Sequence, residues 1–123
     1  MLGPESGLVR GTLDVLILKS LSWGPRHGYA VAEWIRVVTD EQLLVEEGPL
    51  YTALHRLERR GLLTAEWGYS ENNRKARYYQ LSRTGRSHLR AEVSGWESYA
   101  RAVTKALAAV SPARNRSPSL NGS

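Results

Sequence analysis

The sequence predicts a mainly α fold with a β-hairpin, followed by a long C-terminal helix. Three observations predict it. In three segments before residue 62, apolar residues recur with the period of an α-helix. Residues 62–81 form two alternating segments around a polar turn, as in a hairpin. Beyond residue 88, apolar residues follow one another at heptad spacing. The length of 123 residues fits one domain, and the 41% hydrophobic content is typical of a globular protein.

Two helices are predicted before residue 40. The first spans Thr12–Leu21 and begins near Gly11 or Thr12. It is apolar on more than one side, so we expect it to be buried on more than one face, one of which could belong to another subunit. After the helix-breaking segment Ser22–Pro25, a second helix is predicted over Arg26–Thr39. Its inward-facing residues are Val31, Trp34, Ile35 and Val38.

The third predicted helix, Pro49–Arg60, follows a short polar connection at residues 40–47 and has one apolar side. Pro49 suits a first helical turn, and Gly61 suits the position after the last turn. The apolar residues, at i, i+3, i+4 and i+7, are Leu50, Ala53, Leu54 and Leu57. The other side carries hydroxyl, imidazole and guanidinium groups, which can bond base edges and phosphates. These residues are Tyr51, Thr52, His55, Arg56 and Arg59.

Two alternating segments, Leu62–Tyr69 and Ala76–Leu81, predict antiparallel strands joined by a turn at Ser70–Lys75. A hairpin directly after a helix-turn-helix is the wing of a winged helix-turn-helix domain, which we assign to residues 8–81. The tip of the hairpin and the strand behind it carry side chains that can reach phosphates or a minor groove. These residues are Asn73, Arg74, Lys75 and Arg77.

The last predicted helix covers residues 82–110 and carries the heptad series. A long helix after a complete small domain has little of its own core left to cover, so we predict that it is a dimerisation helix. The expected dimer interface consists of Leu13, Leu16, Ile17, Leu89, Val93, Trp96, Ala100, Val103 and Leu107. By composition, residues 1–7 are a disordered N-terminal arm and residues 111–123 are a disordered tail.

The net charge of +5 is unevenly distributed. Residues 1–47 hold four basic and seven acidic residues, a balance of −3, so residues 48–123 carry +8. A basic half that begins at the third helix indicates a polyanionic partner. The absence of cysteine is compatible with a cytoplasmic location, and no apolar run is long enough to cross a membrane. We therefore expect no membrane partner. Residues 1–7 also lack the basic start and apolar core of a secretory signal.

Catalytic and metal-binding patterns are absent from the sequence. His27, His55 and His88 lack the spacing and the carboxylate partners of a metal site. No phosphate-binding glycine-rich loop, nucleophile elbow or paired acid and base is recognisable. The sequence therefore predicts a protein that is not an enzyme and that holds no metal or cofactor.

A series of motifs, in order and spacing, resembles the PadR family of bacterial transcriptional regulators. The motifs are Leu8–Leu13, His27–Tyr29, Glu47–Tyr51, Leu54–Glu58, Gly61–Leu62, Asn73–Tyr79, Leu81–Gly85 and Trp96. The resemblance covers residues 8–108. It implies a winged-helix DNA-binding domain, a C-terminal dimerisation helix, and a homodimer that usually represses genes and is released by a small molecule. The single C-terminal helix is similar to the short-tailed branch of the family.

Together, the residues and the resemblance predict a sequence-specific DNA-binding regulator. The third helix would enter the major groove of double-stranded DNA, and two subunits would read a pseudo-palindromic operator with half-sites about 34–36 Å apart. The expected DNA-binding residues are Pro49, Tyr51, Thr52, His55, Arg56, Arg59, Asn73, Arg74, Lys75 and Arg77. Alternatively, Tyr51 packs against the hairpin and His55 is merely solvated. We expect Glu58 to pair with a neighbouring arginine.

The tryptophans have separate interpretations. In multidrug-binding members of the family, a tryptophan at the place of Trp96 stacks flat ligands between subunits. The resemblance therefore makes Trp96 a candidate site for a planar or aromatic effector, and the alternative is a packed interface residue. Trp23, Trp34 and Trp67 are predicted core or hinge residues. The alternative for the whole chain is a winged-helix module for protein–protein or RNA contacts that binds no operator.

Overall fold

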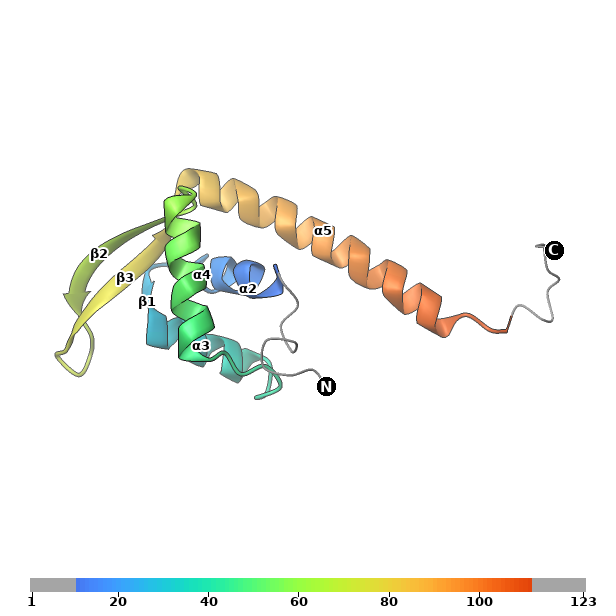
Figure 1. Ribbon diagram of the computed structural model, residues 1–123, viewed down its shortest axis with the longest axis horizontal. Helices are drawn as coiled ribbons and strands as arrows, with labels where there is room; N and C mark the ends of the chain where they lie inside the picture. Colours follow the sequence, from blue (N-terminus) through green and yellow to red (C-terminus); the bar gives the residue numbers. More distant parts are fainter. Residues whose placement is uncertain (1–10, 112–123) are drawn as a thin grey trace. The chain divides into compact units, whose positions relative to one another are not determined.

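The computed structural model describes residues 11–111, and Figure 1 shows the order of their helices and strands. The predicted arm at residues 1–7 and the predicted tail from residue 112 onward lie outside the described residues. The chain divides into two compact units, of which the first ends at Val93 and the second begins at Ser94. Within the described part, no helix is both long and apolar enough to span a lipid bilayer.

Three helices build the first unit: α2 (Thr12–Ser20), α3 (Gly28–Val38) and α4 (Glu47–Arg59). As predicted, α2 begins next to Gly11, which is its N-cap residue in the left-handed conformation. His27 caps α3, because its Nδ1 atom accepts a hydrogen bond from the Ala30 amide at 3.2 Å.

The apolar stripe of α4 is buried as predicted, with all four of its residues at most 2% exposed. It shares one core with buried residues of the other two helices and of the C-cap of α2, which are Ile17, Leu18, Leu21, Val31 and Ile35. The inward face of α3 is narrower than predicted. Val38 is 51% exposed because α3 ends there, and Trp34 is only half-buried.

A three-stranded antiparallel sheet completes the domain, with the order β1-β3-β2. Its strands are β1 (Arg26–His27), β2 (Leu63–Tyr69) and β3 (Lys75–Leu81). The short strand β1 corrects the prediction that the second helix begins at Arg26. Arg26 instead pairs with Tyr79 of β3, and His27 pairs with Tyr78. The start of α3 is thereby joined to the hairpin.

The predicted hairpin is formed by β2 and β3, which pair from Leu63 opposite Leu81 to Tyr69 opposite Lys75. Asn73 in the turn has a φ of 61°, a left-handed conformation that asparagine tolerates. At the base of the hairpin, Leu63 and Leu81 are buried against the helices. The hairpin therefore has a fixed base, and its tip extends beside α4 (Figure 1).

Helix α5 (Arg83–Ala108) follows β3 after one residue, Ser82. The Ser82 hydroxyl donates to the Gly61 carbonyl at 2.7 Å and accepts from the Gly85 amide at 2.9 Å. Within the first unit, Leu89 is buried and Val93 packs against the core. Beyond Ser94, apolar side chains of α5 are exposed in the single chain, namely Trp96, Tyr99, Val103 and Leu107.

Candidate nucleic-acid interface

The polar side of α4 faces away from the core. Pro49, Thr52, His55 and Arg59 are all exposed, because they lie off the buried stripe of the same helix. They form an outward-facing side of α4, as predicted. The described residues contain no group of three or more histidine, aspartate or glutamate side chains that could hold a metal ion.

Arg56 differs from its neighbours on α4, because its guanidinium is already engaged within the chain. It forms an ion pair with Asp14 of α2, whose side chain is largely buried. The two residues are 42 positions apart in the chain, and their pair joins α2 to α4. Arg56 therefore serves to hold α2 against α4, which the pattern of α4 alone does not reveal.

Tyr51 lies at the start of α4, half-buried against the first turn of α3. A Cβ atom at Gly28 would lie 2.5 Å from the Tyr51 hydroxyl oxygen, so a larger residue there would have to displace the Tyr51 ring. Burial raises the pKa of the Tyr51 phenol, and the Glu47 carboxylate raises it further. The phenol therefore keeps its proton at neutral pH and can donate a hydrogen bond to an anion.

The tip of the hairpin presents exposed polar and basic side chains, as predicted. Asn73, Arg74 and Lys75 are all exposed. Across residues 11–111, neither Arg74 nor Lys75 takes part in an ion pair, and the same holds for Arg59 of α4. These three cations are therefore available to neutralise phosphates.

Arg77 lies behind the tip on β3 and is held in place by α4. Its Nη2 atom donates to Glu58 Oε2 at 2.8 Å, which confirms the prediction that Glu58 pairs with a neighbouring arginine. The guanidinium carbon also lies 5.8 Å from the ring centroid of Trp67 and 6.0 Å from that of Tyr79. Arg77 therefore connects the hairpin to α4.

Two of the tryptophans are not core residues. Trp67 on β2 is 59% exposed, and Trp23 in the turn after α2 is 64% exposed, so of the two roles predicted for them, core or hinge, the core role is wrong. A lysine ammonium lies over each ring. Lys75 Nζ is 5.1 Å from the Trp67 ring centroid, and Lys19 Nζ is 4.8 Å from the Trp23 ring centroid. Trp34 packs against the core.

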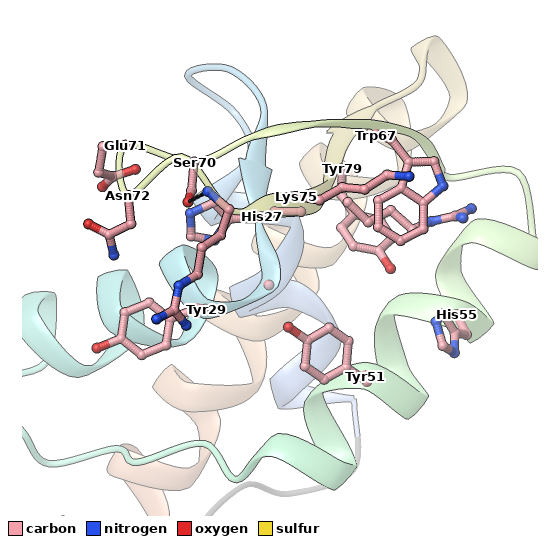
Figure 2. A pocket seen from close by; sticks show the side chains of 14 residues that line it. His27, Tyr29, Tyr51, His55, Trp67, Ser70, Glu71, Asn72, Lys75 and Tyr79 are labelled. Atoms are coloured by element: carbon pink, nitrogen blue, oxygen red, sulfur yellow. Dashed lines mark hydrogen bonds between the residues drawn. The ribbon is translucent and has the colours of Figure 1, made fainter.

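A cleft of about 530 Å³ separates the hairpin from α4 and the start of α3. Figure 2 shows its aromatic and polar lining: Tyr51 and His55 project from α4, Trp67 and Lys75 from the hairpin, and Tyr29 from α3. Arg74 and Arg77 also line the cleft. Phenol, imidazole, ammonium and guanidinium groups, together with the Glu71 carboxylate, thus border one concave surface. Its cationic groups outnumber the one carboxylate, so the surface suits a polyanion with apolar parts.

Comparison with known proteins agrees with this geometry. Residues 17–91 match the model of the transcriptional regulator PadR-like family. A transcriptional regulator from Clostridium thermocellum is 31% identical, with a TM-score of 0.71 over 79% of this chain and 91% of that chain. A PadR family transcriptional regulator from Eggerthella lenta is 32% identical, with a TM-score of 0.68 over 82% of this chain and 86% of that chain. An uncharacterized protein from Lysinibacillus sphaericus is 30% identical over 75% of this chain and 84% of its own length.

Proposed function

We propose that this chain, which belongs to the PadR-like family of transcriptional regulators, is a repressor that binds a pseudo-palindromic operator as a homodimer and is released by a small molecule. Membership of the family makes it a DNA-binding regulator and not an enzyme. Repression, the operator symmetry, the dimer and the effector are our proposal. We place its action in the cytoplasm, where a bacterial regulator meets DNA.

The observation that carries the proposal is that the polar side of α4 and the hairpin tip border the same cleft. We propose that α4 enters the major groove, where Thr52 and His55 reach base edges. Tyr51 donates its hydroxyl hydrogen to a phosphate, since its phenol is protonated at neutral pH. Pro49 and Arg59 lie along the same exposed side of α4 and approach the sugar–phosphate backbone of the DNA.

The hairpin tip supplies the second set of contacts. Asn73, Arg74 and Lys75 bind phosphates or the adjacent minor groove. Arg77 has a different role, because its charge is paired with Glu58. It positions the hairpin against α4 and so sets the distance between the two sets of contacts.

We propose that α5 forms the dimer. Exposed apolar side chains at heptad spacing are typical of a helix that pairs with another helix. Trp96, Val103 and Leu107 are exposed, and Ala100 is half-buried. Leu13, Leu16 and Val93 keep part of their surface and contribute at the edge of the interface. Ile17 and Leu89 are instead buried in the core of their own chain, which leaves them little surface for a partner.

The proposed effector is a planar aromatic molecule that stacks on Trp96. This side chain is 46% exposed, and its ring centroid lies 6.0 Å from that of Tyr99. Two adjacent aromatic faces on one exposed helix favour a flat or cationic guest. In a dimer, the same two side chains of the partner would complete the site.

Binding to labelled duplexes tests the proposal. At the same salt concentration, the protein should retard a duplex from its own promoter region more strongly than an unrelated duplex of the same length. If the dimer neutralises about six phosphates, affinity should fall by roughly 10³ between about 50 and 200 mM salt. A protein that retards neither duplex at 50 mM salt would be a module for protein contacts, contrary to the proposal.

A further inference from the structure

Trp67 is a large apolar side chain that is not part of the buried core. It lies on β2, lines the cleft, and has 59% of its surface exposed. A side chain of this size is normally well covered in the free protein, so an open indole on the wall of a cleft indicates a contact made on binding. The inference below rests on the proposed DNA-binding function.

One cation is available beside this indole. Lys75 and Arg77 both lie near the Trp67 ring, at 5.1 Å and 5.8 Å from its centroid. The charge of Arg77 is already paired with Glu58, whereas Lys75 forms no ion pair among residues 11–111. The hairpin therefore presents an exposed indole with the ammonium of Lys75, which forms no ion pair within the described part of the chain, over its ring (Figure 2).

The Trp67 indole and the Lys75 ammonium match the two chemical parts of a DNA backbone, the sugar and the phosphate. The opposite wall is α4, with Tyr51 and His55. A duplex held by α4 in one groove and by the hairpin tip in the next must pass one sugar–phosphate strand across the space between them. Such a strand alternates an anionic phosphate with an apolar deoxyribose. We infer that the Trp67 indole packs against a deoxyribose of the strand that crosses the cleft, while Lys75 binds the adjoining phosphate.

The chain offers a matched control for this contact. Trp23 is also exposed and also carries a lysine, since Lys19 Nζ lies 4.8 Å from its ring centroid. It lies in the turn after α2 and does not line the cleft. Its ring also contacts Trp34, with the ring centroids 5.7 Å apart. Replacing Trp23 therefore removes a second lysine-covered indole that lies outside the cleft, at no smaller cost to packing than replacing Trp67.

Binding should be measured with a duplex of mixed sequence of about 30 base pairs, long enough for two half-sites. If the sugar covers about 60 Å² of each indole, Trp67→Ala should weaken binding about tenfold for each subunit, and about 100-fold for a dimer that binds through both subunits. Trp23→Ala should leave it unchanged within twofold. The salt dependence should separate the two wall residues: Trp67→Ala keeps the wild-type slope, whereas Lys75→Ala lowers it by about 0.9 for each phosphate that the variant no longer neutralises.

Fluorescence provides a second measurement with a milder variant. Trp67→Phe retains an aromatic side chain and so preserves the hairpin. Adding the same duplex should change the tryptophan emission of the wild-type protein and of Trp23→Phe, and the change should be largely absent in Trp67→Phe. Circular dichroism of each variant establishes that it is folded.

Three results would overturn the inference alone, with the wild type still binding the duplex. They are equal affinities for Trp67→Ala and Trp23→Ala, an emission change that persists in Trp67→Phe, and a flattened salt slope in Trp67→Ala. The last would mean that the indole only positions Lys75. A wild-type protein that binds no duplex at 50 mM salt would instead refute the proposed function itself.

Discussion

Breaking the ion pair between Glu58 and Arg77 should destabilise the winged domain. The pair joins α4 to β3 across 2.8 Å, and it is the main polar link between the helix and the hairpin wall. Replacing Glu58 by glutamine removes the negative charge with little change in volume. It leaves the Arg77 guanidinium without a counterion, and its Nε atom is buried with no hydrogen-bond partner among the described residues.

The degree of burial sets the expected magnitude. Exposed ion pairs contribute about 0–1 kcal/mol, whereas removing one partner of a buried pair costs about 3–5 kcal/mol. The side chains of Arg77 and Glu58 are 37% and 28% exposed. Their ion pair is therefore intermediate between an exposed and a buried pair, and closer to an exposed one. We expect Glu58→Gln to lower the free energy of unfolding by about 1–2 kcal/mol. A domain of this size then loses about 4–8 °C of Tm for each kcal/mol.

A double-mutant cycle measures the pair itself. Urea unfolding of Glu58→Gln, Arg77→Met and the double variant should give a coupling energy of about 1 kcal/mol. The pair of Glu33 and Arg36, which lies within α3, is a control for which a smaller coupling is expected. If the effects at Glu58 and Arg77 add within about 0.3 kcal/mol, the ion pair does not hold the hairpin and our reasoning is wrong.

Three further predictions concern other parts of the chain. Gly85→Ala should destabilise the protein by about 1–3 kcal/mol in urea unfolding, because its Cβ would collide with the backbone carbonyl of Leu62. Gly95→Ala on the same helix meets nothing within 4 Å and should be neutral or stabilising, so equal losses would contradict this explanation. Burial raises the pKa of Tyr51 above its ordinary value, so the stability it contributes is present below about pH 10 and declines as pH rises beyond it. Tyr51→Phe should therefore lose less stability than the wild type between about pH 9 and 11, and identical pH profiles would refute the assignment. Trp96→Ala should weaken the dimer in sedimentation equilibrium or abolish binding of a planar fluorescent ligand; a variant that retains both would exclude our account of α5.

The sequence predicted the elements that have a strong period. The stripe of α4 and the alternation of the hairpin repeat over enough residues to identify the fold and the exposed side of α4. Strand β1 has two residues, too few to show any alternation, so it was assigned to the helix that follows it. The ion pair of Arg56 was missed for a different reason. Its partner Asp14 lies 42 residues away, and only the packing of α2 on α4 brings the two side chains together.

Trp67 shows why alternation does not determine burial. Leu63, Ala65 and Trp67 lie on the same face of β2, because successive side chains of a strand alternate between faces. Leu63 is 2% exposed and Ala65 is half-buried, but Trp67 is open. All three residues lie on one face, but the helices cover only the base of the hairpin, so Trp67 lies beyond the covered part. The extent of that layer depends on tertiary packing, which the pattern of one strand cannot reveal.

The single residue between β3 and α5 has a mechanical consequence. Ser82 bonds to the end of α4 through Gly61 and to the first turn of α5 through Gly85, while its own amide donates to the Leu62 carbonyl at 3.0 Å. The link between β3 and α5 is too short to take up a rotation of α5 by itself. A rotation of the first turn of α5 would therefore have to break these three hydrogen bonds or move the hairpin with it.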